Sequence, residues 1–249
     1  MTARPLVSIV TPSWGRESVL PLAHARVLAQ TYPEIEWLVF DDSPRPCAYL
    51  QERAGPRLKY IYSPSRFAVG EKRNILAEQS SGEIIIHFDD DDFYAPAYVD
   101  RMVEVLAQGN DAAKLSGWFL YSAVHRRFGY WDTGRGGSHH RWGRTAASYV
   151  EAPDTPPSED NLIGYGFSYA YRRSVWEASG FPPVNACEDA PFLREAARRF
   201  RVAAIPDGEG LCLHTLHARS TSLCLPQYEL PAILLERLFG PEVRPYTGV

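Results

Sequence analysis

Short apolar runs alternate with amphipathic stretches over the first 110 residues of the chain. The runs are a few residues long and bounded by charged or turn-forming residues, which predicts strands at 7–11, 37–40, 59–62 and 84–88. Between these runs, apolar side chains recur at helical spacing, which predicts helices at about 20–28, 68–80 and 99–106. Strands that alternate with helices predict an α/β protein with a mostly parallel sheet.

The run at residues 84–88 is the centre of this pattern. A continuous apolar run is typical of a strand buried on both faces, and this one leads directly into four carboxylates, Asp89 to Asp92. Adjacent carboxylates repel one another unless a cation lies between them, so the pattern predicts Mg²⁺ or Mn²⁺ that carries phosphates. In an extended chain, Asp89 and Asp91 would share one face and Asp90 and Asp92 the other. A solvated acidic turn is the alternative interpretation.

Polar residues follow two more of the predicted strands. Residues 11–15 come after the first strand, and Asp41 and Asp42 follow the second. In open parallel sheets, ligands bind beyond the carboxyl ends of the strands. With Lys72 and Arg73 on the next predicted helix, the ligand that fits best is a nucleotide with a metal-bound diphosphate.

The second half of the chain is less regular. It predicts strands at 116–122, 166–171, 202–205 and 211–213, a helix that opens at Glu188 and Asp189, and a last helix at about 230–239. Glycines and prolines break every period between 128 and 161, which predicts a long loop. That loop is either a surface excursion or an acceptor-binding lid with aromatic platforms. We therefore expect a single domain with an acceptor-side extension.

Composition narrows the choice of partners. The chain has 249 residues and a formal net charge of -4, without a basic stripe, so nucleic acid is not an expected partner. The four cysteines have neither zinc-site spacing nor the density of a disulfide scaffold, which predicts reduced thiols. No apolar run is long enough to span a bilayer, and no signal region precedes the first strand. We expect a cytoplasmic protein without a transmembrane segment, which can still lie peripherally at a membrane.

Several motifs occur in the order seen in family 2 glycosyltransferases. They are residues 7–12, Gln30 to Trp37, Asp41-Asp42-Ser43, Lys72-Arg73-Asn74, Asp89 to Asp92, Gly180-Phe181, Glu188-Asp189 and His217. The chain resembles this inverting family, which has the GT-A fold of the nucleotide-diphospho-sugar transferase superfamily. The resemblance covers residues 5–108 closely and 164–225 more loosely, whereas 125–160 match no known motif.

The resemblance implies a domain organisation and a donor site. It divides the domain into a nucleotide-sugar-binding half (1–108), an acceptor-binding and catalytic half (109–225) and a C-terminal helix and tail (226–249). The donor is a nucleotide-diphosphate sugar, most often a UDP-sugar. The residues implied to bind it are Pro12, Trp14 (stacked on the base), Asp42 (at the uracil), Lys72, Arg73, Asp89 and Asp90.

The resemblance also implies the metal and the catalytic base. Asp89 and Asp91 match the D-x-D element, with Asp91 as the direct ligand of Mn²⁺ or Mg²⁺, and His217 matches a histidine near the metal and diphosphate. Asp189 matches the general base, because an acceptor hydroxyl needs a carboxylate to take its proton during attack on the anomeric carbon. Acids at a helix N-terminus are the alternative reading of Glu188 and Asp189, and a histidine bonded to backbone is that of His217.

The expected function is therefore transfer of a single sugar to an unknown glycan or small-molecule acceptor. No Gln-x-x-Arg-Trp element is present, which argues against a processive polysaccharide synthase. Gly15 replaces the asparagine that commonly follows the aromatic residue. Two alternatives are a catalytically inactive relative that binds nucleotide or glycan, and a sugar nucleotidyltransferase. The segment from Pro12 to Arg16 is too poor in glycine for the phosphate loop of the latter.

Overall fold

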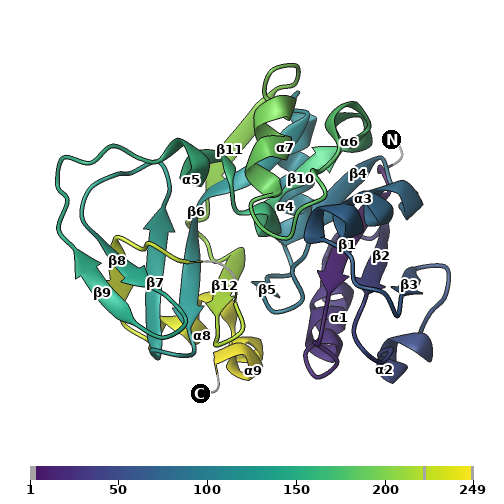
Figure 1. Cartoon of the computed structure of the whole chain (residues 1–249), viewed down its shortest axis with the longest axis horizontal. Helices are drawn as coiled ribbons and strands as arrows, with labels where there is room; N and C mark the ends of the chain where they lie inside the picture. Colours follow the sequence, from purple (N-terminus) through teal and green to yellow (C-terminus); the bar gives the residue numbers. More distant parts are fainter. Residues whose placement is uncertain (1–3, 221–222, 248–249) are drawn as a thin grey trace. The chain divides into compact units, whose positions relative to one another are not determined.

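The four apolar runs of the N-terminal half form neighbouring parallel strands, as predicted. The computed structural model describes residues 4–220 and 223–247. The strands are β1 (Val7–Ser13), β2 (Ile35–Asp41), β3 (Leu58–Tyr62) and β4 (Ile84–His87). Strand β1 pairs with β2 on one side and β4 on the other, and β2 pairs with β3 (Figure 1).

Helices connect these strands, and their apolar spacing explains why they form. They are α1 (Leu20–Leu28), the short α2 (Ala48–Gln51), α3 (Val69–Gln79) and α4 (Tyr98–Ala107). Helix α4 buries Tyr98, Met102, Val105 and Leu106, which recur at the spacing of one helical face. Helix α3 differs because it also buries the charged Lys72 and Arg73.

The chain folds into two compact units that interleave along the sequence. The first unit contains the described residues up to Asp90, then Pro96–Lys114 and Ile163–Ala203. The second contains Asp91–Ala95, Leu115–Leu162 and the described residues from Ala204 onwards. Strands β6 (Ala112–Ser122) and β11 (Val202–Pro206) each have residues in both units.

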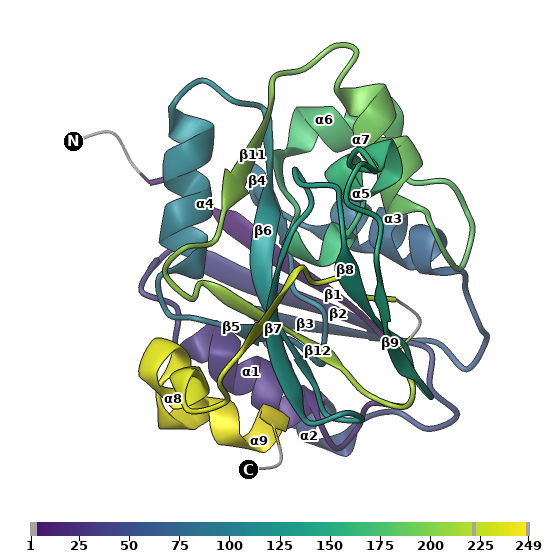
Figure 2. The same ribbon diagram turned by 90° about the vertical axis from the view of Figure 1, so that its left-hand side faces the viewer.

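The first unit is completed by elements from the second half of the chain. Strand β10 (Ala170–Arg172) lies antiparallel to β4, so the sheet is mostly but not wholly parallel. Helices α6 (Arg173–Ser179) and α7 (Asp189–Ala196) pack with α3 around one apolar cluster, and Figure 2 shows these three helices together. That cluster includes Leu76, Val175 and Phe192, all buried.

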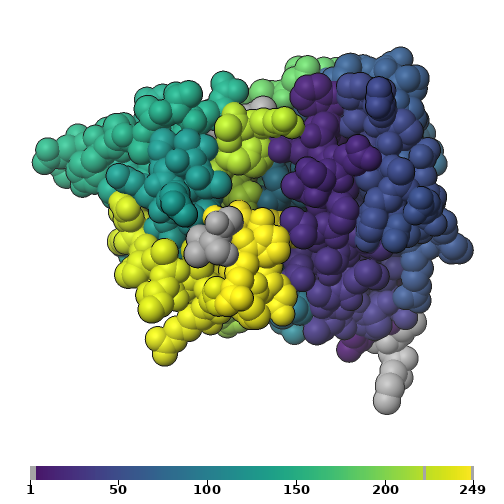
Figure 3. All heavy atoms as spheres, turned by 90° about the horizontal axis from the view of Figure 1, so that it is seen from below, coloured from purple at the N-terminus to yellow at the C-terminus, as the bar shows by residue number. Residues whose placement is uncertain are grey.

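The second unit is built around β6. Strand β12 (Cys212–Leu216) pairs in parallel with β6 and antiparallel with β5 (Phe93–Tyr94). On the other side, β6 pairs with β7 (Arg127–Asp132), which pairs with β13 (Tyr228–Leu230). The C-terminal elements are α8 (Leu234–Phe239), η2 (Pro241–Val243) and α9 (Arg244–Thr247). Their residues, yellow in Figure 3, pack against the sheet of this unit through Phe239 and Val243.

The predicted loop over 128–161 is wrong. This segment contains most of β7, the two-stranded ribbon of β8 (His139–Trp142) and β9 (Ala147–Val150), and α5 (Glu159–Ile163). A glycine need not end a strand here. Gly129 lies within β7, and the Trp142 ring packs against it. A Cβ atom at Gly129 would lie 2.8 Å from Cη2 of Trp142.

Two further predictions need correction, and two are confirmed. The predicted strand at 166–171 is a 3₁₀ turn, η1 (Gly166–Ser168), followed by β10. The last helix begins at Leu234 rather than near residue 230, because β13 precedes it. All four cysteines are free thiols, as predicted. Over the described residues, no helix has the length and apolar character needed to cross a membrane, in agreement with the sequence.

Candidate active site

Three strand ends of the first unit meet at one edge of its sheet, as the sequence predicts. Ser13, the last residue of β1, lies beside Asp41 of β2 and donates from its hydroxyl to Oδ2 of Asp90, 2.6 Å away. The Gly15 amide donates to Oγ of Ser43 at 2.7 Å, and this hydroxyl in turn donates to Asp41. The loops after β1 and β2 are therefore tied together by hydrogen bonds.

Asp42 is the best-supported carboxylate at this edge. Its side chain is 0% exposed, and it accepts from the Phe67 amide at 2.8 Å, from Nη1 of Arg66 at 2.9 Å and from the ammonium of Lys72. Lys72 also donates to the Ser13 carbonyl at 2.9 Å. Burial lowers the pKa of Lys72, although Asp42 opposes that shift. The site therefore holds Asp42 and Lys72 as a buried ion pair.

Trp14 contacts the same arginine, Arg66, as Asp42 does, and it is open to solvent. It follows Ser13 at the end of β1, and half of its surface (50%) is exposed. The guanidinium carbon of Arg66 lies 4.3 Å from the centre of its ring. Pro12 precedes this loop within β1 and is half-buried. An exposed indole next to a buried carboxylate can bind a flat, polar ring by stacking and hydrogen bonding.

Arg73 contacts acidic groups from two other segments of the first unit. Its Nε donates to Oε1 of Glu188 at 3.0 Å, and its Nη2 lies 3.6 Å from Oδ1 of Asp89. Burial alone would lower the pKa of Arg73, but Asp89 and Glu188 outweigh it and raise the pKa. His87 Nδ1 lies 2.8 Å from Nη1 of Arg73, and burial together with Arg73 holds the pKa of His87 well below its usual value. His87 is therefore a neutral imidazole at physiological pH.

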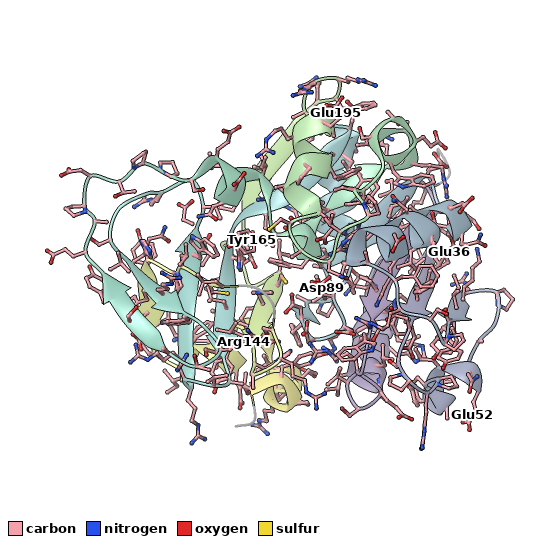
Figure 4. The ribbon with its side chains drawn as sticks, in the orientation of Figure 1. Glu36, Glu52, Asp89, Arg144, Tyr165 and Glu195 are labelled. Atoms are coloured by element: carbon pink, nitrogen blue, oxygen red, sulfur yellow. The ribbon has the colours of Figure 1, made fainter. Side chains whose placement is uncertain are left out.

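Asp189 is the first residue of α7 and is half-buried. Its Oδ2 accepts from the Gly166 amide at 2.8 Å, and its Oδ1 accepts from the Ala190 amide at 2.8 Å. Because each oxygen has a further lone pair, the carboxylate can still accept a proton or hydrogen bond. Tyr165, labelled with Asp89 in Figure 4, precedes Gly166 and has the left-handed φ of 68°. Such backbone strain in a non-glycine residue is characteristic of functional sites.

A buried lysine supports the loop that contacts Asp189. Lys114, near the start of β6, is 1% exposed and donates from Nζ to the Gly164 carbonyl at 2.7 Å. Burial lowers its pKa to about 7, although the negative charge of Asp189 opposes the shift. Lys114 therefore combines a structural hydrogen bond with a charge that changes near neutral pH.

The second unit pairs each of the last two acidic residues of the run with a histidine. Oδ2 of Asp91 lies 2.7 Å from Nε2 of His217, and Oδ2 of Asp92 lies 2.7 Å from Nδ1 of His214. Thr215 fixes the segment, because its amide donates to Asp92 at 2.8 Å and its hydroxyl donates to the Asp91 carbonyl at 2.6 Å. Asp92 raises the pKa of the buried His214 well above the usual value, against the effect of burial.

The acidic run does not have the extended geometry that the sequence suggested. Asp90 and Asp91 form a turn, so the alternation expected for a strand does not apply. Asp89 and Asp90 contact Arg73 and Ser13 of the first unit, whereas Asp91 and Asp92 contact histidines of the second. The four aspartates therefore divide into Asp89 and Asp90, which contact the first unit, and Asp91 and Asp92, which contact the second.

The Asp91–His217 pair has the chemistry of a partial metal site. Among the described residues, no three His, Cys, Asp or Glu side chains are grouped to hold a metal ion. Divalent ions at nucleotide sites, however, commonly use one or two protein ligands and complete their shell with phosphate oxygens and water. Both side chains of the pair are partly exposed, at 19% for Asp91 and 24% for His217. The pair therefore fits Mn²⁺ or Mg²⁺ held together with a diphosphate.

Comparison with solved structures shows that this fold is the GT-A fold. Staphylococcus aureus TarS residues 1–349 in complex with UDP-GlcNAc superposes with a TM-score of 0.64 at 17% identity, over 87% of this chain and 60% of that chain. The mannosyltransferase PcManGT from Pyrobaculum calidifontis, in complex with GDP-Man and Mn2+, gives 0.61 at 18% identity, over 86% of this chain and 57% of that one.

Comparison at the sequence level shows the family. The family model of glycosyl transferase family 2 matches residues 8–174, and the chain belongs to this family. The Escherichia coli K12 protein WcaA is 32% identical over 100 residues, 39% of this chain and 36% of WcaA. The Escherichia coli protein WfgD, named as a UDP-Glc:alpha-D-GlcNAc-diphosphoundecaprenol beta-1,3-glucosyltransferase, is 28% identical over 107 residues, 42% of each chain. The matched stretches span about a third to a half of such relatives.

Sequence reasoning missed several residues of this site. Arg66 and Lys114 were not singled out, and His87 was read as part of an apolar strand. Lys114 had a signal, because it interrupts an apolar strand sequence where a charge needs a partner. Arg66 had none, since its partners Trp14 and Asp42 lie on other loops. Glu188 was ranked below Asp189, and the structure gives it a separate role as the partner of Arg73.

Proposed function

We propose that the protein is a metal-dependent inverting glycosyltransferase that moves one sugar from a UDP-sugar to an acceptor hydroxyl. Membership of glycosyl transferase family 2 supports the reaction class. The observation that carries the mechanism is the half-buried Asp189 carboxylate, which is held by two backbone amides and can still accept a proton. UDP is chosen because TarS was solved with UDP-GlcNAc and because WfgD is named for a UDP-Glc donor.

In this proposal the edge of the first unit binds the nucleotide. The base stacks on the exposed Trp14, above the turn that Pro12 begins, and hydrogen-bonds to Asp42. The contact with Lys72 supports this role, because it fixes the position of the Asp42 carboxylate. Arg73 and Lys72 supply positive charge for the diphosphate, and Asp89 and Asp90 lie with the ribose or the sugar.

For the metal we propose Asp91 and His217, which both belong to the second unit. The 2.7 Å approach of Asp91 to His217 supports this assignment, because an oxygen and a nitrogen donor are already side by side. When bound, Mn²⁺ or Mg²⁺ would neutralise charge on the leaving diphosphate. Thr215 would keep Asp91 in place, because its hydroxyl bonds the Asp91 carbonyl.

Asp189 acts as the general base in this scheme. As the acceptor oxygen forms its bond to the anomeric carbon, its proton passes to the Asp189 carboxylate and the bond to the diphosphate oxygen breaks. One displacement of this kind inverts the anomeric configuration. Arg73 connects the two parts of the site, because it pairs with both Glu188 and Asp89. Glu188 precedes the base Asp189 in the chain, and Asp89 lies with the donor in this proposal.

The test is release of UDP from a panel of UDP-sugars by the purified protein with Mn²⁺. We expect release from at least one donor, stimulated by a sugar acceptor and abolished by EDTA. Binding of UDP without release from any donor would instead support the catalytically inactive relative. Release of pyrophosphate from UTP and a sugar phosphate would support the sugar nucleotidyltransferase.

A further inference from the structure

We propose that Arg66 competes with the nucleotide base for Trp14 and Asp42 and thereby limits the affinity for the donor. This inference rests on the proposed donor site, in which the base uses those two residues. It adds a residue that must leave the site each time a nucleotide enters.

The contacts of Arg66 are those that a uracil ring would make. Its guanidinium lies over the Trp14 ring at 4.3 Å, and its Nη1 donates to Oδ1 of Asp42 at 2.9 Å. A guanidinium is planar, stacks on aromatic faces and carries its N–H donors in the ring plane. Uracil is also planar and presents one N–H donor at its edge. The two groups therefore cannot use the same face of Trp14 and the same carboxylate at once.

The surrounding backbone keeps the two partners of Arg66 in place. The Gly15–Ser43 hydrogen bond of 2.7 Å ties the loop of Trp14 to the loop of Asp42. The loop that carries Arg66 is anchored at both ends, because the Ser63 amide donates to the Asp41 carbonyl at 3.0 Å and the Phe67 amide to Asp42 at 2.8 Å. Exchange of Arg66 for a base therefore needs a side-chain rotation rather than a loop movement.

Arg66 can leave without exposing an unpaired buried charge. Its side chain is 53% exposed, whereas the Asp42 side chain is 0% exposed. When Arg66 swings into solvent, Asp42 keeps the Lys72 ammonium and the Phe67 amide. Arg66 and Trp14 are each about half exposed, and the contacts of such exposed side chains are individually weak, so the competition should change affinity by about fivefold rather than by orders of magnitude.

The test is calorimetric titration of UDP with Mn²⁺ into wild type, Arg66→Ala and Arg66→Lys. We expect Arg66→Ala to bind UDP about fivefold more tightly, and Arg66→Lys to fall between the two, because lysine keeps the charge but loses the flat stacking surface. Arg53→Ala is the matched control and should bind as wild type. Arg53 also covers an aromatic ring, that of Tyr49, at 3.9 Å, and it pairs with Glu52 at 3.5 Å.

The outcomes separate this inference from the proposed reaction. Tighter binding by Arg66→Ala supports the inference whether or not sugar transfer is detected. Unchanged binding overturns it. Weaker binding also overturns it, and would show that Arg66 contacts the bound base. If no variant binds UDP, both this inference and the donor site fail. Melting temperatures of the variants show whether they fold, and a crystal structure with UDP should show Arg66 away from Trp14.

Discussion

Asp189 is the proposed general base, and a variant at this residue can separate catalysis from UDP binding. The Asp189→Asn variant can keep an acceptor oxygen for the Gly166 amide, loses the one that the Ala190 amide uses, and cannot take a proton. We expect kcat to fall by about a hundredfold or more, with the affinity for UDP unchanged. Steady-state kinetics and titration with UDP measure the two effects.

The control for that variant lies on the same helix. Glu195 of α7 pairs with Arg198 at 2.6 Å at the surface, so Glu195→Gln should retain kcat near the wild-type value. A full kcat for Asp189→Asn would assign the base to another residue.

Lys114 gives a prediction about pH and stability. Burial lowers its pKa to about 7, so between pH 7 and its unfolded pKa near 10.5 the unfolded chain binds more protons than the folded one. The contribution of Lys114 to folding stability therefore rises with pH across this range. Lys114→Met removes that dependence. The free energy of unfolding of the variant minus that of wild type should therefore be larger at pH 6 than at pH 9, by on the order of a few kcal/mol.

Urea unfolding at the two pH values measures this difference. Other titrating groups are present in both proteins and cancel in the comparison. An equal stability difference at pH 6 and pH 9 would show that Lys114 does not change its protonation on unfolding.

Single residues were predictable from sequence where a short motif carried them. Asp42, Asp91, Asp189 and His217 were found in this way, and their catalytic and binding roles stay predictions. Lys114 has a local signal, a charge in an apolar stretch, but its acceptor, the Gly164 carbonyl, lies 50 residues away in the sequence. Local patterns report neighbours along the chain, not neighbours across a sheet.

At the scale of elements, the turn at Gly166 packs against Asp189, the proposed base at the start of α7. A Cβ atom added at Gly166 would lie 2.9 Å from Cβ of Asp189, which is too close for either side chain to stay in place. Gly166→Ala should therefore lower kcat by about a hundredfold through displacement of the base, with little change in UDP affinity.

Gly55→Ala is the matched control, because a Cβ atom there meets nothing within 4 Å. It should leave kcat unchanged. Wild-type kinetics in Gly166→Ala would show that the contact between η1 and α7 does not set the position of Asp189.

The elements of the first half were predictable because buried parallel strands read as apolar runs and their helices as amphipathic ones. The region from 128 to 161 was not, because some of its glycines, such as Gly134, lie at turns, whereas Gly129 lies inside a strand against a neighbouring ring. Gly117 of β6 shows the same effect, since a Cβ atom there would lie 2.4 Å from the hydroxyl of Tyr130. Sequence alone does not show whether a glycine breaks a strand or admits a neighbouring ring.

At the scale of the whole molecule, ligand binding should appear as a rise in stability. A ligand that binds only the folded protein at a hundred times its Kd stabilises it by about 2.7 kcal/mol. We expect UDP and Mn²⁺ together to raise the melting temperature more than either alone, and His217→Ala to lose most of this synergy.

His139→Ala is the control for that measurement, because His139 is a partly exposed histidine of the same unit that bonds the Gly137 carbonyl. An undiminished synergy in His217→Ala would remove His217 from the metal site.

The α/β class and the mostly parallel sheet were predictable, whereas the interleaving of two compact units was not. Asp91 meets His217 across a separation of 126 residues. Strands β6 and β11 each have residues in both units, so two of the boundaries between the units fall inside strands. Contacts over such separations depend on the folded sheet and leave no local pattern.

The most direct measurement of the central claim is the anomeric configuration of the transferred sugar, determined by NMR on the product formed from a UDP-sugar with Mn²⁺. We predict a product with the configuration opposite to that of the donor, formed by wild type and lost in Asp189→Asn. A product that retains the donor configuration, or one that Asp189→Asn forms at the wild-type rate, would contradict the assignment of Asp189 as the base of a single displacement.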